Sequence, residues 1–188
     1  MTISINQVAS GIALNVDGNL YLVTDYQHVK PGKGSAFVRI KLKNIKTDQV
    51  VERTYKTADK LDDVPLEERK LQNLYRSGDG YHFMDYTTYE EVVVTEDILG
   101  DNVKFLKENL EIEALSLNEK VLKVILPTFV EMEITHTEPG FKGDTSRAGT
   151  KPATIETDAT IQVPLFIEIE DMIKIDTRTG EYVERVKK

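Results

Sequence analysis

Several residue types and segments are missing from this chain of 188 residues, and each absence removes a class of structure. There is no cysteine, which excludes disulfide bonds and thiolate metal sites. No apolar run approaches the roughly 18–20 residues that a membrane-spanning helix needs. The N-terminal stretch MTISINQVASG has no positive segment followed by an apolar one, so it does not indicate a signal peptide. We therefore expect a cytoplasmic protein with no membrane partner.

Motifs that support catalysis or metal binding are missing as well. No Gly-x-Ser-x-Gly motif occurs, and Lys33-Gly34 has neither the spacing nor the following helix of a phosphate-binding loop. The three histidines are too far apart in sequence to indicate a metal centre: His28, His82 and His136. The closely spaced carboxylates are typical of solvated strand faces: Glu90 with Glu91, and Glu131 with Glu133. The sequence predicts no catalytic residue, no metal site and no enzyme.

The basic residues are concentrated in one part of an otherwise acidic chain. The net charge is −8, yet residues 28–46 contain no acid and six basic residues: Lys30, Lys33, Arg39, Lys41, Lys43 and Lys46. A local basic patch on an acidic protein fits a polyanionic partner such as nucleic acid. A solvated strand face is the alternative, and charge alone leaves both open.

Residues 20–55 predict a β-hairpin followed by a third strand. From Ser35 to Lys43, apolar residues alternate with basic ones, which is typical of a half-buried strand with a basic outer face. Residues 20–29 predict its partner, PGKG the turn between them, and residues 50–55 the next strand. Together with a tight hairpin at Asp17-Gly18, these strands predict a small barrel that ends near residue 63.

The rest of the chain predicts two further β units. Residues 57–70 carry the charge and proline of a connector, and strands are expected on both sides of residues 77–80. Residues 96–110 contain the one helical stripe. More strands are expected at residues 111–115, 121–126, 159–167, 172–175 and 182–186, and Val130, Met132 and Ile134 predict a strand that opens the third unit.

Two segments can contact a polyanion. Lys33 lies between glycines, so the backbone around it is bare enough to enter a narrow space, and without an apolar pocket it is a poor nucleophile. The second segment is a long loop over residues 136–153, in which Lys142 to Thr145 and Lys151 offer hydrogen bonds to single-stranded RNA. For this loop a plain turn remains the stronger interpretation of the residues alone.

Five stretches, taken in order, resemble bacterial elongation factor P over nearly the whole chain: HVKPGKGSAFVRIKLKN, YHFMDYTTYE, EPGFKGDTSRAGTKPATIET, VPLFI and IKIDTRTGEYVERVK. The resemblance implies an all-β protein of three small β-barrel domains in an L-shaped arrangement. Residues 1–64 correspond to an SH3-like (KOW-like) domain. Residues 65–128 correspond to an OB domain with one short helix, and residues 129–188 to a second OB domain.

The resemblance also implies a non-enzymatic translation factor that binds rRNA of both ribosomal subunits between the P and E sites. Such factors stimulate peptide-bond formation at consecutive prolines by positioning the P-site peptidyl-tRNA. By its place in KPGKG, Lys33 matches the tip lysine. The matching tip-loop and tRNA contacts are Lys30, Pro31, Gly32, Gly34 and Arg39, and Gly143, Asp144 and Thr145 match the loop near the E-site mRNA codon.

No cofactor is implied apart from a covalent modification of Lys33, such as β-lysylation or an aminopentanol group, which a lysine-modifying enzyme adds. We expect a monomer. Three residues depart from the glycines expected in family turns: Asp48, Asp158 and Glu170. Asp tolerates glycine-like turn conformations and Glu does so less well. An elongation factor P-like paralogue and a generic single-stranded RNA-binding OB protein remain the alternatives.

Overall fold

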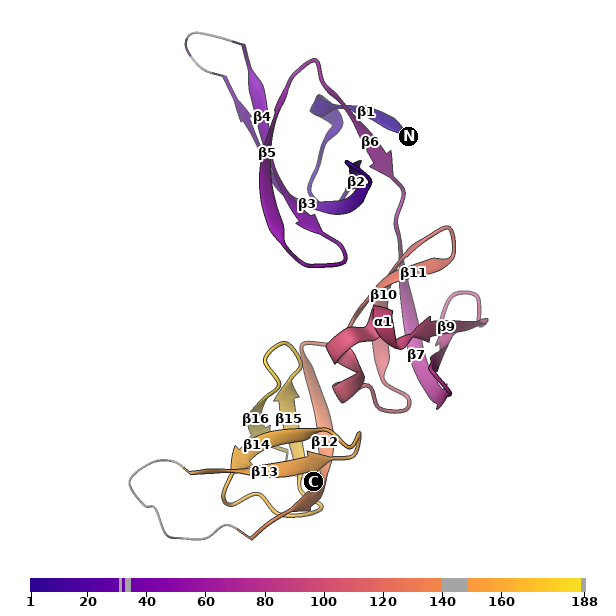
Figure 1. The fold of residues 1–188 in the computed structure, drawn as a ribbon, viewed down its shortest axis with the longest axis vertical. Helices are drawn as coiled ribbons and strands as arrows, with labels where there is room; N and C mark the ends of the chain where they lie inside the picture. Colours follow the sequence, from indigo (N-terminus) through magenta and orange to yellow (C-terminus); the bar gives the residue numbers. More distant parts are fainter. Residues whose placement is uncertain (31, 33–34, 140–148, 187–188) are drawn as a thin grey trace. The chain divides into compact units, whose positions relative to one another are not determined.

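The computed structural model describes residues 1–30, 32, 35–139 and 149–186, which form three curled antiparallel sheets one after another along the chain (Figure 1). A 3₁₀ turn, Ile5–Gln7, follows the first strand of the first sheet, and its Ile5 is buried in the core. Its strands follow in spatial order: β1 (Thr2–Ser4), β6 (Lys60–Val64), β2 (Ala13–Val16), β3 (Asn19–Val29), β4 (Phe37–Asn44) and β5 (Val50–Lys56).

The core of the first sheet follows the alternation seen in the sequence. Val38, Ile40 and Leu42 on β4 are fully buried, while Arg39 and Lys41 between them are exposed. Each buried aliphatic side chain of this size contributes about 1.5–3 kcal/mol of transfer free energy. The predicted strands at residues 20–29, 35–43 and 50–55 are confirmed as β3, β4 and β5.

The connector predicted at residues 57–70 is wrong over most of its length. Residues 60–64 form β6, which pairs with both β1 and β2 and completes the first sheet, and β7 already begins at Glu67. Leu61 in β6 is 6% exposed. Leu61 is the one buried residue of KLDDV, so the segment shows no apolar alternation, and its many charges hid the strand in the sequence.

The second and third sheets have the same strand order, with the first strand of each in the centre. The second contains, in spatial order, β11 (Lys120–Ile125), β10 (Glu111–Leu117), β7 (Glu67–Ser77), β8 (Gly80–Asp85) and β9 (Glu91–Thr95). The third contains β14 (Thr160–Pro164), β13 (Thr150–Ile155), β12 (Phe129–Thr137), β15 (Met172–Asp176) and β16 (Glu181–Arg185). Numbered within each sheet, both orders read 3-2-1-4-5 in one direction, which fits two copies of one fold.

The helix predicted over residues 96–110 is present but short. The helix α1 covers Glu96–Leu99 and continues as a 3₁₀ helix over Gly100–Phe105. Gly100 has φ +54°, and a residue in this left-handed region ends a regular α-helix. Leu99 and Leu106 of the predicted stripe are buried, so the apolar spacing identified the buried side chains but overestimated the length of the helix.

The loop predicted over residues 136–153 is also shorter than expected. The strand β12 continues to Thr137 and β13 begins at Thr150, and these strands pair as far as Thr137 and Ala153. Lys151 does not extend from a loop toward a partner: it is 8% exposed, and its Nζ donates to the carbonyl of Glu138 at 2.7 Å. This part of the predicted RNA-binding segment is therefore structural.

The three residues that depart from the expected glycines all have left-handed backbones. Asp48, Asp158 and Glu170 have φ values of +58°, +63° and +68°. Non-glycine residues pay a steric cost in this region, which is smaller for Asp. The sequence interpretation of these positions as glycine-type turns is confirmed.

Close contacts divide the described chain into two compact units. The first comprises residues 1–68 and 115–123, and the second comprises residues 69–114 and 124–188. The three-domain division at residues 64/65 and 128/129 remains a prediction. Within the described residues, no helix has the length and apolar character needed to cross a membrane.

Candidate nucleic-acid interface

The residues predicted to contact RNA form two groups, and the structure describes some residues of the first group and none of the second. Lys30, Gly32 and Arg39 lie on or beside the β3–β4 hairpin. The remaining predicted contacts lie outside the described residues: Pro31, Lys33, Gly34, Gly143, Asp144 and Thr145. The geometry of the hairpin is therefore the basis for judging the first group.

The hairpin is built from the longest strand pair of the first sheet. The strands β3 and β4 pair from Tyr21 and Asn44 to Val29 and Phe37, with a register shift beside Thr24. We call residues 26–29 and 37–40, which end at Val29 and Phe37, the tip half of the hairpin. We call residues 21–25 and 41–44, which end at Asn44, the base half (Figure 1).

The cations of the base half are paired with carboxylates. The Nζ of Lys41 lies 3.4 Å from Asp25 Oδ2, and the Nζ of Lys43 lies 2.8 Å from Asp48 Oδ1. These side chains are about half exposed, so each pair contributes at most about 1 kcal/mol to stability. Their main consequence is that neither ammonium is a free positive charge.

The cations of the tip half have no such partner within the described chain. Lys30 and Arg39 make no ion pair with any described carboxylate, and the same holds for Lys56 at the end of β5. In the sheet, Arg39 lies between the neutral residues Gln27 and Thr54. Positive charge that the protein does not neutralise is available to phosphate groups.

The guanidinium of Arg39 lies over an aromatic ring, that of Phe37. The guanidinium of Arg39 lies 5.7 Å from the centre of the Phe37 ring, within the range of a cation–π contact. Lys56 pairs with Phe37 across the sheet, so Arg39, Phe37 and Lys56 lie together at the tip half. Sequence reasoning missed Lys56, although it is the last residue of the strand-like run VVERTYK and alternates with Thr54.

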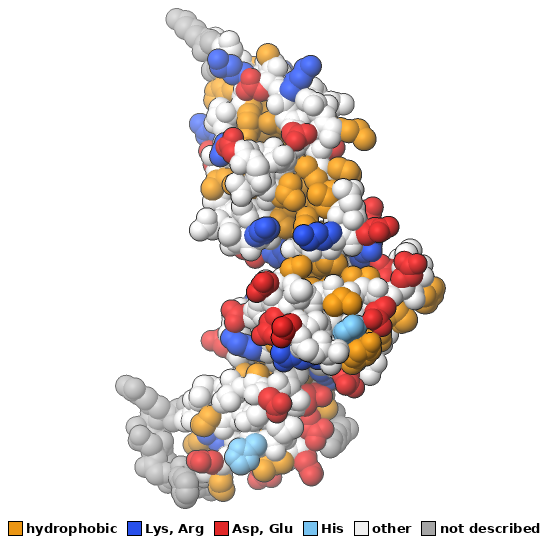
Figure 2. Space-filling view, turned by 45° about the vertical axis from the view of Figure 1, so that its right-hand side comes forward, with side chains coloured by type: hydrophobic (Ala, Val, Ile, Leu, Met, Phe, Trp, Pro, Cys, Tyr) orange, Lys and Arg blue, Asp and Glu red, His pale blue; other side chains and the backbone are white. Residues whose placement is uncertain are grey.

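Lys46 is an exception to this division. It follows β4 in the turn at the base, is exposed, and makes no ion pair within the described residues. More generally, Lys and Arg side chains are interspersed with Asp and Glu side chains on the face shown in Figure 2. The candidate interface is therefore marked by where the cations lie on the hairpin and by how they are paired, not by a continuous basic face.

Glu91 begins β9 and is exposed, as predicted for a solvated strand residue, and its carboxylate also contacts two ring side chains of the second sheet. Its carboxylate accepts from the hydroxyl of Tyr75 at 3.3 Å and lies 2.7 Å from Nδ1 of His82. The rings of Tyr75 and His82 are stacked, with centres 4.4 Å apart. Burial, followed by the nearby Glu91 charge, raises the pKa of Tyr75.

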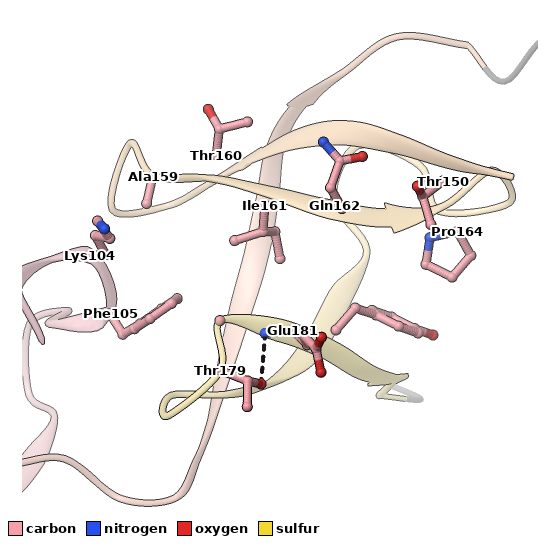
Figure 3. Close-up of a pocket in the computed structure, with 12 residues that line it drawn as sticks. Lys104, Phe105, Thr150, Ala159, Thr160, Ile161, Gln162, Pro164, Thr179 and Glu181 are labelled. Carbon is pink, nitrogen blue, oxygen red and sulfur yellow. Dashed lines mark hydrogen bonds between the residues drawn. The ribbon is translucent and has the colours of Figure 1, made fainter. Parts of the chain in front are cut away.

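A groove of about 610 Å³ lies within the second unit, between β14 and β16. Figure 3 shows Ile161 and Phe105 pointing into the space between these strands, with Lys104 at one end. Glu181 and Tyr182 complete the ionisable side chains of its lining. In the described part of the chain, no three His, Asp or Glu side chains come together as a metal site.

Three family models match consecutive parts of the chain. They are the elongation factor P KOW-like domain over residues 4–61, the elongation factor P OB domain over residues 66–124, and the elongation factor P C-terminal domain over residues 130–185. The chain belongs to the elongation factor P family. The SH3-like and OB-type fold expected from the sequence is thereby confirmed, and the described residues contain one short α-helix, α1.

Relatives of similar length support this membership. Elongation factor P of Moorella thermoacetica is 50% identical over 183 residues, which cover 97% of this chain and 99% of the relative. Elongation factor P of Caldanaerobacter subterraneus subsp. tengcongensis is 51% identical over 176 residues, which cover 94% and 95%. A solved translation initiation factor eIF-5A family protein from Naegleria fowleri has a TM-score of 0.51 at 16% identity. The match covers 67% of this chain and 98% of that one, a similarity of fold.

Proposed function

We propose that this elongation factor P family member binds the ribosome between the P and E sites and stimulates peptide-bond formation at consecutive prolines. In this proposal the protein supplies no catalytic group. It holds the P-site peptidyl-tRNA through Lys33 at the tip of the first hairpin, with Lys30, Arg39 and the neighbouring Pro31, Gly32 and Gly34 beside it. The observation that carries the proposal is the charge of Lys30 and Arg39 at the tip half, which makes no ion pair with any carboxylate of the described residues.

The physical basis is the geometry of proline. Its ring restricts the backbone, so the peptidyl-tRNA populates reactive arrangements less often. A protein that holds the substrate in a productive arrangement lowers the entropic part of the barrier, while the ribosome performs the chemistry. A thin, cationic tip suits this role because it combines attraction to phosphate with access to a narrow space.

The test is a translation assay on a reporter that encodes three consecutive prolines, using protein from its own host. We expect the wild type to relieve stalling and Lys33→Ala to lose at least about tenfold of that activity, because an alanine tip has neither charge nor reach. Lys46→Ala is the matched control, since Lys46 is an exposed lysine at the base of the hairpin that makes no ion pair with any described carboxylate. Relief by Lys33→Ala equal to the wild type would remove the tip from the mechanism.

Two further measurements address the remaining parts of the proposal. Intact-mass analysis of the native protein tests whether a lysine-modifying enzyme extends Lys33, for example by β-lysylation, and a mass equal to that of the plain sequence would exclude the modification.

Asp144→Ala tests the contact of Gly143, Asp144 and Thr145 with the E-site codon. It should weaken relief without unfolding the protein, and wild-type relief by this variant would exclude the contact.

A further inference from the structure

The turn between β4 and β5 contains an aspartate where the backbone favours glycine. Asp48 has φ +58°, and its amide donates to the carbonyl of Asn44 at 3.0 Å. The left-handed region is less favourable in free energy for an aspartate than for a glycine, because glycine has no Cβ. Unlike a glycine, the aspartate at this position makes a side-chain contact.

That contact is a bridge between two lysines. Asp48 Oδ1 accepts from Lys43 Nζ at 2.8 Å and also from Lys123 Nζ. Lys43 belongs to the base half of the hairpin, and Lys123 belongs to β11, 75 residues after Asp48 in the chain. All three residues lie within the first compact unit.

The bridge differs from an ordinary surface ion pair because one oxygen serves two cations. The side chain of Lys123 is only 22% exposed, so solvent screens its charge less than it screens a fully exposed ammonium. Without the carboxylate, two positive charges would approach each other with nothing between them. Removal of the negative charge therefore abolishes two attractions and leaves the repulsion between the two lysines uncompensated.

We propose that Asp48 is a positioning residue, which ties the base of the β3–β4 hairpin to β11 and so restricts the direction in which the tip points. The proposal rests on the function proposed above, because direction matters only if the tip has a target. A group that acts by position needs a supported base, since looseness lowers the fraction of molecules in the productive geometry.

The first experiment measures the restriction without the ribosome. The chain contains no cysteine, so Glu52→Cys on β5 and Lys120→Cys on β11 allow spin labels at two defined positions. We expect pulsed electron–electron double resonance to give a narrow distribution of distances between the two spin labels, and we expect Asp48→Asn to broaden that distribution. Asparagine tolerates the left-handed backbone as well as aspartate does, so the substitution removes charge while keeping the turn.

Asp158→Asn is the matched control, because Asp158 has φ +63° and makes no ion pair in the described chain. It should leave the distribution unchanged. Lys123→Met should broaden the distribution without touching the turn at all, and exchange of the charges in Asp48→Lys with Lys123→Asp should narrow it again in part. An unchanged distribution in both Asp48→Asn and Lys123→Met would overturn the proposal.

The second experiment measures relief of stalling on the three-proline reporter. Asp48→Asn and Lys123→Met should raise the factor concentration needed for half-maximal relief about threefold to fivefold, with the maximal rate unchanged. Lys120→Met is the control, since Lys120 is an exposed lysine on the same strand. If the wild type itself fails to relieve stalling, the proposed function is wrong while the distance measurement still decides the bridge. An unchanged half-maximal concentration in both variants would show that the bridge does not position the tip.

Discussion

The two halves of the β3–β4 hairpin hold their cations in opposite ways. In the base half, Lys41 and Lys43 each face a carboxylate. In the tip half, Arg39 lies over an aromatic ring and makes no ion pair within the described residues. The strand β4 carries both a paired and an unpaired cation of the described residues, and these two positions, Lys41 and Arg39, are only two residues apart.

This difference separates two uses of positive charge that composition cannot distinguish. A paired lysine contributes to solubility and, weakly, to stability. An unpaired cation beside neutral neighbours retains its attraction for phosphate, and each phosphate contact makes binding more sensitive to salt. Pairing within the protein therefore indicates which end of a basic segment meets a polyanion.

The largest effect among the described residues is expected for Arg39→Ala. Loss of a charged hydrogen-bond donor at a phosphate costs about 1.5–3 kcal/mol, so ribosome binding should weaken by about tenfold or more, and its dependence on salt should become less steep. Lys41→Ala is the control, because it removes a paired lysine from the same face of the same strand. Equal losses in binding for the two variants, measured by filtration of labelled ribosomes, would contradict the comparison.

A smaller loss is expected for Lys56→Ala. Lys56 lies opposite Phe37 at the tip half and offers one mobile ammonium rather than a planar guanidinium, so we expect binding to weaken about threefold. Lys60→Ala on β6 serves as the control, since Lys60 is also exposed and pairs instead with Ser4 of β1. A loss for Lys60→Ala as large as that for Lys56→Ala would mean that general charge, not the tip, determines affinity.

The sequence predicted those parts of the hairpin that depend on local alternation. The period of two placed Val38, Ile40 and Leu42 in the core and Arg39 outside it. It missed β6 because pairing with β1 and β2 is a contact between distant segments, and such contacts override the local charge of KLDDV.

The pairing of the cations could not be predicted either. Asp25 and Asp48 are 16 and 5 residues from the lysines of the base half that they contact, and only the register of the sheet brings Asp25 beside Lys41. Lys123 reaches Asp48 from β11, a contact for which the sequence carries no periodic signal. The motifs of the sequence predicted that the hairpin is a site, whereas the division of its cations into two halves comes from tertiary pairing.

Asp25→Asn tests the base half directly. The change frees Lys41 without altering the number of cations, so an unpaired lysine then stands away from the tip. We expect ribosome binding to change by less than about twofold and the free energy of unfolding by less than about 0.5 kcal/mol, as for other exposed pairs. A gain of several-fold in binding would show that any unpaired cation on the hairpin reaches the polyanion, whatever its place.

The smallest effect concerns the titration of Asp48. Burial raises the pKa of this carboxyl, but hydrogen bonds from Lys123 and Lys43 lower it by more, so its pKa lies below the ordinary 3.8. A carboxyl with a lowered pKa in the folded state contributes stability above its unfolded pKa, and that contribution is lost as the pH falls through the folded value. We therefore expect the base half to lose this support only below about pH 3.8.

The pKa of Asp48 can be read from its carboxyl carbon in an NMR titration. The midpoint should lie below 3.8 in the wild type and move upward in Lys123→Met, because one of the two cations that favour the charged form is gone. Lys120→Met should leave the midpoint where it is, since Lys120 does not contact Asp48. A midpoint that Lys123→Met leaves unchanged would mean that Lys43 alone holds the carboxylate, and the base half would then be paired only within its own hairpin.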